Sequence, residues 1–357
     1  MQRCHRSTCV SKGLRSSAGA GREQARGAYA FKKRQVRYGT LTCTSSIARA
    51  HRLHVLGAVR DETSNIELIE GCLQSLYGQA TSERVMKSLE LTLSGREVVR
   101  YIATKGEQRA SSYIDGLSAI PYHDVHNGQF TWLEKLEHES ERIKCELNLA
   151  LANPELSSMG NSIWAPAARD DAVAYGPNWR TLVLQDRCQW EEVNCRLFPI
   201  TTEILKAANC PSVEVFFARQ PPNTGIKPHT DNTNFILTAH LGIDVPEQLA
   251  WMQVGEFKKY WANGEGLVAD TSFIHSTANE SNDKDRYVLI VRFWHPELRD
   301  VERQALQFLF EALDNPSSHG IHAAAERARQ RLPTKMSRRK RRSSTHEGLG
   351  LLSKGMR

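Results

Sequence analysis

Three strand-like runs surround a short polar motif in the second half of this 357-residue chain. Residues 212–219 and 234–243 are rich in β-branched or aromatic residues and are bounded by Pro, Gly or Asn, which is typical of strands. A third run, residues 286–294, reads Arg-Tyr-Val-Leu-Ile-Val-Arg-Phe-Trp and has the same character. His229 and Asp231 lie between the first two runs, so one strand is predicted to enter this motif and another to leave it.

The spacing of His229, Asp231 and His275 is suited to a metal site. Side chains two apart on a strand point the same way, so one short strand is predicted to supply His229 and Asp231. His275 follows 44 residues after Asp231 and can return to the same place on an antiparallel strand. Two imidazoles and one carboxylate are the ligand set of non-heme Fe(II) oxygenases, which leaves open positions for a 2-oxo acid and O₂. Both histidines must be neutral to bind, so metal affinity is predicted to fall as the pH drops through about 6.5.

A His-x-Asp/Glu motif alone is uninformative. With 13 His and 40 acidic residues in the chain, roughly 1.5 matches are expected by chance, and short motifs carry this false-positive risk. Two matches occur, His229/Asp231 and His295/Glu297. The strands predicted on both sides of His229 and Asp231 favour metal binding there.

Arg286 opens the third strand-like run. A period of two places Arg286, Val288, Ile290 and Arg292 on one face of that strand. A charge at the head of such a run is usually exposed to solvent or part of a surface ion pair. The alternative is a guanidinium that grips a carboxylate with two hydrogen bonds, which Arg does better than Lys. From the residues alone, both interpretations of Arg286 remain open.

Five short segments between residues 130 and 300 occur in a distinctive order. They are Cys195-Arg-Leu-Phe-Pro199, Lys227-Pro-His-Thr230, Asn234 through Gly242, Asp270-Thr-Ser-Phe-Ile-His275, and Arg286 through Leu298. Together they resemble the aspartyl/asparaginyl β-hydroxylase family of Fe(II)/2-oxoglutarate dioxygenases. The resemblance covers about half of the chain, and its specificity comes from the order and spacing of several segments.

This resemblance implies a fold, a set of cofactors and a set of site residues. The fold is α+β, with a double-stranded β-helix core (jelly-roll, cupin-like) and flanking helices. The implied cofactor is Fe(II), with 2-oxoglutarate as cosubstrate and O₂. His229 and His275 are implied as iron ligands, completed here by Asp231, and Arg286 and His240 as contacts to 2-oxoglutarate. The segment that contains His295 and Glu297 is implied to be structural.

The chain departs from the animal peptidyl hydroxylases of the family near the expected iron. Those enzymes have a glycine where this chain has Asp231, and arginines where it has Ile236 and Thr238. The expected reaction is hydroxylation of an unactivated carbon, with the β-carbon of a peptidyl Asp or Asn as the first candidate. The alternatives are hydroxylation of a small-molecule or lipid acyl acceptor, a catalytically silent β-helix module that binds a ligand or partner, and a nuclear regulator acting through its basic tail.

A net positive charge occurs only at the two ends of the chain. Residues 1–60 contain 13 Lys or Arg and one acid, and residues 327–357 contain 11 Lys or Arg and one acid. The remaining 23 basic and 38 acidic residues make the middle of the chain acidic. The net charge of +7 therefore belongs to the ends, and no nucleic-acid binding is expected of the core domain.

The composition of the ends predicts a leader and a tail. Residues 1–60 are rich in Arg, Ser, Ala and Gly, which is typical of a transit peptide for a plastid or mitochondrion; the alternative is a disordered basic arm on a cytosolic or nuclear protein. Residues 331–357 contain a polybasic cluster that could contact polyanions or direct nuclear import. No apolar run approaches 18 residues, so no transmembrane segment is predicted.

The expected organisation between the ends has three parts. Residues 61–129 form an N-terminal region that looks helical up to residue 120, and residues 130–300 form the hydroxylase-like domain, with a helix over 130–152 backing its sheets. Residues 301–330 form a helical C-terminal extension. The eight cysteines include no Cys-x-x-Cys pair, and without a secretory signal they are predicted to be reduced thiols.

Overall fold

The computed structural model describes residues 63–153, 165–166, 174–175 and 179–332. The predicted basic leader, residues 1–60, and residues 333–357 of the predicted tail lie outside the described residues. In the part that the structure describes, no helix is long and apolar enough to cross a membrane. The cysteines in the same part are free thiols, as predicted.

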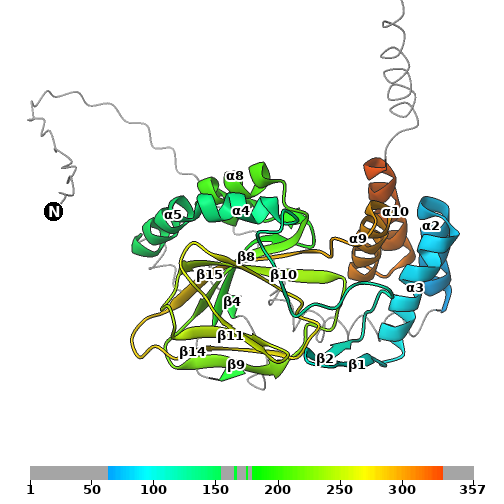
Figure 1. Cartoon of the computed structure of the whole chain (residues 1–357). Helices are drawn as coiled ribbons and strands as arrows, with labels where there is room; N and C mark the ends of the chain where they lie inside the picture. The colour runs from blue at the N-terminus through cyan, green and yellow to red at the C-terminus, as the bar shows by residue number, and fades with distance from the viewer. Residues whose placement is uncertain (1–62, 154–164, 167–173, 176–178, 333–357) are drawn as a thin grey trace, which may run out of the picture. The chain divides into compact units, whose positions relative to one another are not determined.

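Two antiparallel sheets form the centre of the fold (Figure 1). The neighbours in the larger sheet are, in order, β3 (Tyr122–His123), β13 (Gly266–Ala269), β10 (Ile236–Asp244), β15 (Arg286–Trp294), β8 (Ser212–Gln220), β6 (Arg180–Asp186) and β4 (Ala165–Pro166), with β7 (Gln189–Trp190) paired to β6. Those in the smaller sheet are β12 (Phe257–Tyr260), β11 (Ala250–Val254), β14 (His275–Asn279), β9 (Thr224–His229) and β5 (Ala174–Tyr175).

The chain passes back and forth between these sheets. Strand β8 is in the larger sheet, β9 in the smaller, β10 in the larger and β11 in the smaller, and β13, β14 and β15 repeat this alternation. An antiparallel chain that alternates in this way between two sheets is a double-stranded β-helix, which confirms the expected fold class. Strands β8, β10 and β15 also confirm the three runs predicted from the sequence.

Strand β15 is buried on both faces because each face packs against a different layer. Leu289, Val291 and Phe293 belong to a core shared with α4 (Thr131–His138), α5 (Ser140–Ala152) and α8 (Pro199–Ala208). Val288 and Ile290 belong to a second core, which includes strand β11 of the smaller sheet. The face of β15 that was predicted from the period of two is therefore turned toward the smaller sheet. Helices α4 and α5 confirm the helix predicted over residues 130–152.

Helices that precede and follow the central domain in the sequence share a third core. This cluster contains residues of α2 (Thr63–Tyr77), α3 (Gln79–Leu93), α9 (Asp300–Asp314) and α10 (Ser318–Arg331), together with Ile236 and Trp294 from the sheet. An ion pair between Arg84 and Glu302 also joins α3 to α9. The helical extension predicted for residues 301–330 is confirmed by α9 and α10, which pack with the N-terminal helices as one layer.

The helical prediction for residues 61–120 is wrong beyond α3. Strands β1 (Val98–Ile102) and β2 (Gly106–Ala110) form an antiparallel hairpin there. The run Val-Val-Arg-Tyr-Ile favours a strand because it is β-branched and aromatic. Thr104, in the turn after it, and Gly106, at the start of β2, both have positive φ, so the chain reverses at this point. The remaining short helix in the described part is α7 (Glu192–Leu197).

Candidate metal centre

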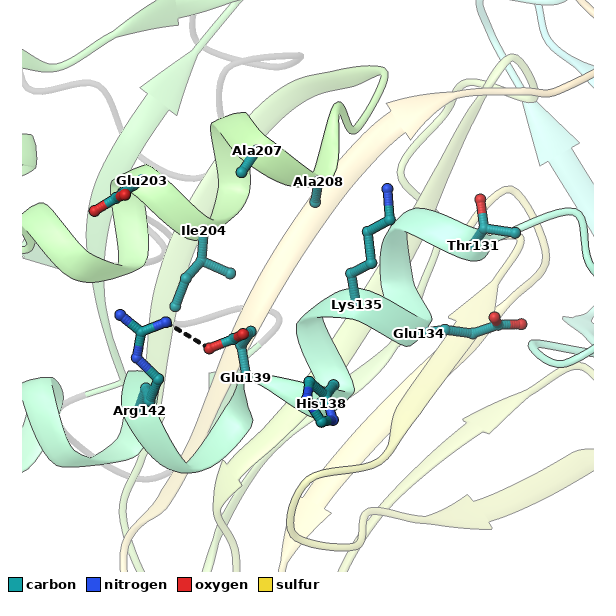
Figure 2. A pocket seen from close by; sticks show the side chains of 10 residues that line it. All are labelled: Thr131, Glu134, Lys135, His138, Glu139, Arg142, Glu203, Ile204, Ala207 and Ala208. Atoms are coloured by element: carbon teal, nitrogen blue, oxygen red, sulfur yellow. Dashed lines mark hydrogen bonds and ion pairs between the residues drawn. The ribbon is translucent and has the colours of Figure 1, made fainter.

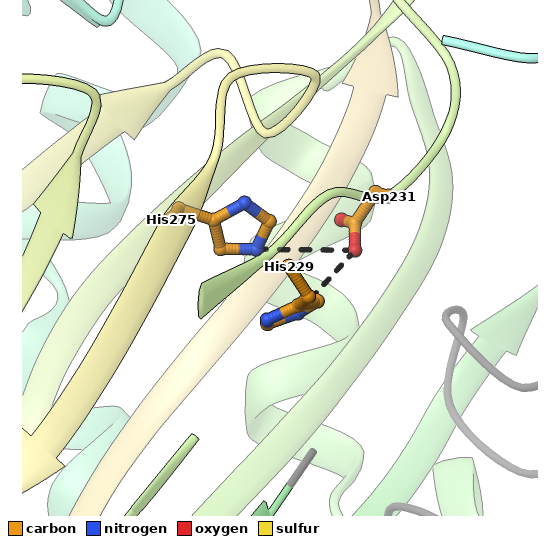
Figure 3. Close-up of side chains that lie close together, drawn as sticks. All are labelled: His229, Asp231 and His275. Atoms are coloured by element: carbon orange, nitrogen blue, oxygen red, sulfur yellow. Dashed lines mark ion pairs between the residues drawn. The ribbon is translucent and has the colours of Figure 1, made fainter. Parts of the chain in front are cut away.

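His229, Asp231 and His275 lie together where β9 ends and β14 begins (Figure 3). His229 is the last residue of β9, His275 is the first of β14, and the two are direct partners across the strands. Asp231 lies two residues beyond the end of β9, so the prediction that one strand carries both ligands was wrong for Asp231. Its N–H donates to the carbonyl of Thr271 (2.9 Å), and Asn232 then turns the chain with a positive φ.

The three side chains face a common point without bonding one another. Oδ1 of Asp231 is 4.0 Å from Nε2 of His229 and 3.9 Å from Nε2 of His275, and all three ligand atoms lie within 4.8 Å of one another. These separations are too long for hydrogen bonds. Both Asp–His distances lie within the span of two metal–ligand bonds of about 2.1 Å each. No second group of three metal-ligating side chains occurs in the described residues.

Backbone carbonyls orient both imidazole rings. Nδ1 of His229 is 2.8 Å from the carbonyl oxygen of Lys227, and Nδ1 of His275 is 3.0 Å from that of Phe273. A carbonyl can only accept, so each Nδ1 carries the proton and donates it. The tautomer inferred from this contact leaves the lone pair on Nε2, which is the arrangement that metal-binding histidines use.

Electrostatics hold the ligands in the protonation states that a divalent cation requires. Burial acts to raise the pKa of Asp231, but Arg292 and the two imidazoles outweigh burial, so that this pKa lies below its usual value. Burial, followed by the charge on His229, lowers the pKa of His275 to about 4. At neutral pH Asp231 is therefore anionic and the ring of His275 is neutral, as ligation demands.

Arg286 and His240 both contact the indole of Trp261. The guanidinium carbon of Arg286 is 4.4 Å from the ring centroid of Trp261, and the His240 ring is stacked on the same indole at 5.7 Å and 12°. Sequence reasoning missed Trp261, which lies in the connection between β12 and β13 and belongs to no motif. Its contacts bring together the two residues that the family resemblance implied as cosubstrate contacts.

Arg286 is a buried cation with no acidic partner among the residues that the structure describes. It is 2% exposed, and its Nε has no hydrogen-bond acceptor there; Nδ1 of His240 is likewise buried and unpaired. Burial lowers the pKa of Arg286 to about 9, so the group remains charged at neutral pH. Burial, and next the charge of Arg286, lowers the pKa of His240 to about 3. A buried charge without a counter-ion is destabilising, so this pocket is suited to an anionic ligand.

Strand β2 and the two residues after it, for which no role was predicted, form backbone hydrogen bonds with the loops that carry the metal ligands. The N–H of Arg109 donates to the carbonyl of Ser272 (2.8 Å), and that of Ser112 donates to the carbonyl of Asn232 (3.0 Å), next to Asp231. Gly255, between β11 and β12, packs closely against the turn of the β1–β2 hairpin. A Cβ atom at this position would lie 1.9 Å from the carbonyl oxygen of Lys105. The residues that make each of these contacts are far apart in the sequence, so no local sequence pattern could have revealed them.

The second His-x-acid motif is structural. His295 is buried, and its Nε2 is 3.2 Å from the carbonyl oxygen of Ser118. The carboxylate of Glu297 accepts hydrogen bonds from the N–H and the hydroxyl of the same serine. Both side chains therefore fasten the loop before β3 to the end of β15, as the resemblance implied.

A groove of about 510 Å³ lies elsewhere, between α4–α5 and α8 (Figure 2). Its lining mixes acidic and basic side chains, including a hydrogen bond from Arg142 to Glu139 of 2.7 Å. The helices that form it cover the face of the larger sheet that is turned away from the smaller sheet, whereas His229 and His275 belong to the smaller sheet. The groove is therefore separate from the metal centre.

Comparison with known proteins identifies the central part of the chain. Residues 137–296 match the family described as Aspartyl/Asparaginyl beta-hydroxylase. The human aspartyl/asparaginyl beta-hydroxylase is 27% identical over 205 residues, which cover 56% of this chain and 26% of that protein. The human aspartate beta-hydroxylase domain-containing protein 2 is 29% identical over 227 residues, covering 60% of this chain and 58% of its own length.

Two further matches are shorter or weaker. The aspartate beta-hydroxylase domain-containing protein 2 of Rattus norvegicus is 36% identical over 124 residues, covering 33% of this chain and 36% of that protein. A crystal structure of an oxidoreductase of the 2OG-Fe(II) oxygenase family from Burkholderia pseudomallei covers 50% of this chain and 95% of its own, with 12% identity and a TM-score of 0.30.

Proposed function

The chain belongs to the aspartyl/asparaginyl β-hydroxylase family, and on that premise we propose that it is an Fe(II)- and 2-oxoglutarate-dependent dioxygenase that hydroxylates an unactivated carbon. The observation that supports this most is a complete His-Asp-His cluster together with Arg286, a buried cation that has no acidic partner in the described residues. His240 links the two sites: it stacks on Trp261, which Arg286 also contacts, and burial followed by the charges of Arg286 and His275 lowers its pKa.

In this proposal each residue has a defined task. His229, Asp231 and His275 would hold Fe(II), and Arg286 would pair with the distal carboxylate of 2-oxoglutarate while neutral His240 contacts the same cosubstrate. When bound, Fe(II) supplies the activation of O₂ that is coupled to oxidation of 2-oxoglutarate. The apolar core between the sheets, which includes Val288 and Ile290, would exclude water from the reacting groups.

We propose the β-carbon of a peptidyl Asp or Asn as the site of hydroxylation, with Asn preferred. The support is the family match together with the charges around the cluster. Ile236 packs into the helical core, and the hydroxyl of Thr238 is 3.1 Å from that of Thr271, so neither position supplies a cation. Arg219 is 2.8 Å from Asp285, and Lys227 is an exposed cation two residues before His229.

Matched peptides that differ only in Asp or Asn test this acceptor preference. We expect more succinate and hydroxylated product from the Asn peptide, and a several-fold loss of the remaining Asp turnover in Lys227→Gln, because an exposed cation adds only a modest, screened attraction. The Asn peptide is the internal control, since its turnover should not change in this variant. A strong preference for Asp that is insensitive to both salt and Lys227→Gln would contradict the proposal.

The same assay separates the alternatives. A small-molecule or lipid acyl hydroxylase would release succinate with a metabolite from a panel and with neither peptide. A catalytically silent binding module would release none with any acceptor. The complete His-Asp-His cluster and the buried Arg286 argue against the silent module, because a module without a metal or cosubstrate has no need of this set.

We also propose that residues 1 to about 55 are a transit peptide for a plastid or mitochondrion, on the basis of their Arg-, Ser- and Ala-rich composition. The mature protein purified from its source cells is then expected to lack this segment. Mass spectrometry of its N-terminal peptide provides the measurement. A mature protein that begins at Met1 would favour the cytosol or the nucleus instead.

A further inference from the structure

Arg292 bridges the metal cluster to a second buried carboxylate. Its Nη2 is 3.5 Å from Oδ2 of Asp231, and its Nη1 is 3.1 Å from Oε2 of Glu214. All three residues are buried. The oxygen of Asp231 that Arg292 approaches is not the one that faces His229 and His275, which is Oδ1.

The strand register explains why this bridge forms. Arg292 of β15 is the direct partner of Glu214 on β8 and of Thr238 on β10, so the three side chains form one row across the larger sheet. Thr238 bonds the hydroxyl of Thr271, whose carbonyl accepts the N–H of Asp231. The row therefore reaches Asp231 at its backbone as well as at its carboxylate.

The two arginines on the inner face of β15 are in opposite situations. Arg286 has no acidic partner in the described part of the chain, whereas Arg292, six positions later, contacts two carboxylates. Arg286 is thus available to a ligand, and Arg292 is occupied by the protein itself. This argues against Arg292 as the cation that receives an acidic acceptor.

We propose that Arg292, oriented by Glu214, is a positioning residue for the metal centre that holds Oδ2 of Asp231 and so keeps Oδ1 turned toward the two Nε2 atoms. The terminal torsion of an aspartate is soft, so a carboxylate without this anchor rotates easily. A planar guanidinium can span two carboxylates, which the single ammonium of Lys cannot do in the same way. This inference rests on the metal site of the proposed function.

Whether metal affinity falls or rises when Arg292 is replaced distinguishes a positioning role from a purely electrostatic one. Removing a positive charge close to a bound cation should tighten metal binding if Arg292 acts only through its charge. Loss of an anchor should weaken binding, and neighbours that orient a metal ligand typically contribute 10- to 100-fold in affinity. We therefore expect Arg292→Gln to bind Co(II) about 10- to 100-fold more weakly than the wild type.

The experiment is an anaerobic Co(II) titration of the full-length protein, read by visible absorption, with thermal unfolding of the metal-free protein measured in parallel. Arg292→Lys keeps the charge and should also bind Co(II) more weakly and change the band shape. Because Arg292→Gln leaves Glu214 buried without a partner, the double variant Glu214→Gln/Arg292→Gln is included to preserve folding; it should still bind weakly. Arg84→Gln, which breaks the Arg84–Glu302 pair, is the matched control, expected to lose stability but not affinity.

The outcomes are distinguishable. Wild-type affinity and an unchanged spectrum in Arg292→Lys and in the double variant would overturn the positioning role while leaving the metal site intact. Tighter binding by the double variant would assign Arg292 a purely electrostatic effect and would also overturn it. If the wild-type protein itself does not bind Co(II), the metal site of the proposed function and this inference fail together.

Discussion

Replacing His275 with Ala is expected to abolish Fe(II) binding by the protein purified without oxygen. The substitution removes one of the three ligand atoms that lie within 4.8 Å of one another, and the described residues offer no other group of this kind. The remaining pair, His229 and Asp231, would have to hold the ion without the imidazole that faces them from β14. Iron content per protein chain, measured after gel filtration, is the readout.

The chain offers a matched control for this variant in His295→Ala. His295 is a buried histidine like His275, but it bonds Ser118 and takes no part in the cluster. It should lose stability and keep its iron. Unchanged iron stoichiometry in His275→Ala would refute the assignment, and loss of iron in both variants would point to general misfolding.

At His275, the expected pH dependence of metal binding differs from that of an unperturbed histidine. That expectation places proton competition near pH 6.5. Because burial lowers the pKa of His275 to about 4, protons compete with the metal at this ligand only near that lower pH. The metal-free protein should lose stability as pH falls from about 6.5 toward 4, since the unfolded chain then takes up a proton that folded His275 does not. Unfolding midpoints measured across this range test the sign.

Motifs in the sequence could identify the metal ligands but not how they are held. His229 and His275 are predictable because strand-like runs and ordered segments flank them. The end of β9 before Asp231 is set by its pairing with β14, which is a property of two distant segments. A period of two could place Arg286 and Arg292 on one face, but it could not tell which would find partners. The partners of Arg292 are Glu214, which comes from β8, and Asp231, which comes from the loop after β9.

The strands that could be predicted and the hairpin that was missed differ in their local sequence signal. Strands β8, β10 and β15 of the larger sheet are buried on both faces and rich in apolar residues, so they can be recognised from the local sequence. The β1–β2 hairpin follows two amphipathic helices, and its Val99 and Tyr101 are exposed, so its segment lacks the alternation of a half-buried strand. Its importance lies in backbone hydrogen bonds to residues near 232 and 272, and backbone contacts between distant segments leave no residue pattern to read.

Arg286→Lys is expected to weaken 2-oxoglutarate binding by about 2 kcal/mol, or roughly 30-fold, because the charge is retained but the two-pronged contact is lost. Calorimetry of the metal-loaded protein under anaerobic conditions measures the dissociation constant. Arg187→Lys serves as the control, since Arg187 is paired with Asp186 and Asp314 and lies outside the site. A dissociation constant that does not move would remove Arg286 from the cosubstrate pocket.

Arg286→Met tests the same role through its effect on the free energy of unfolding. A structural arginine should leave the protein less stable when it is replaced, but Arg286 is a buried cation stacked on Trp261 with no acidic partner in the described residues. Methionine keeps the apolar contact and removes the uncompensated charge, so the ligand-free variant should be more stable, by about 1–4 kcal/mol, while 2-oxoglutarate binding is lost. Denaturant unfolding with and without 2-oxoglutarate measures both effects. Stabilisation together with lost binding is the signature of a residue retained for its ligand, whereas a destabilised variant would mean that Arg286 serves the fold.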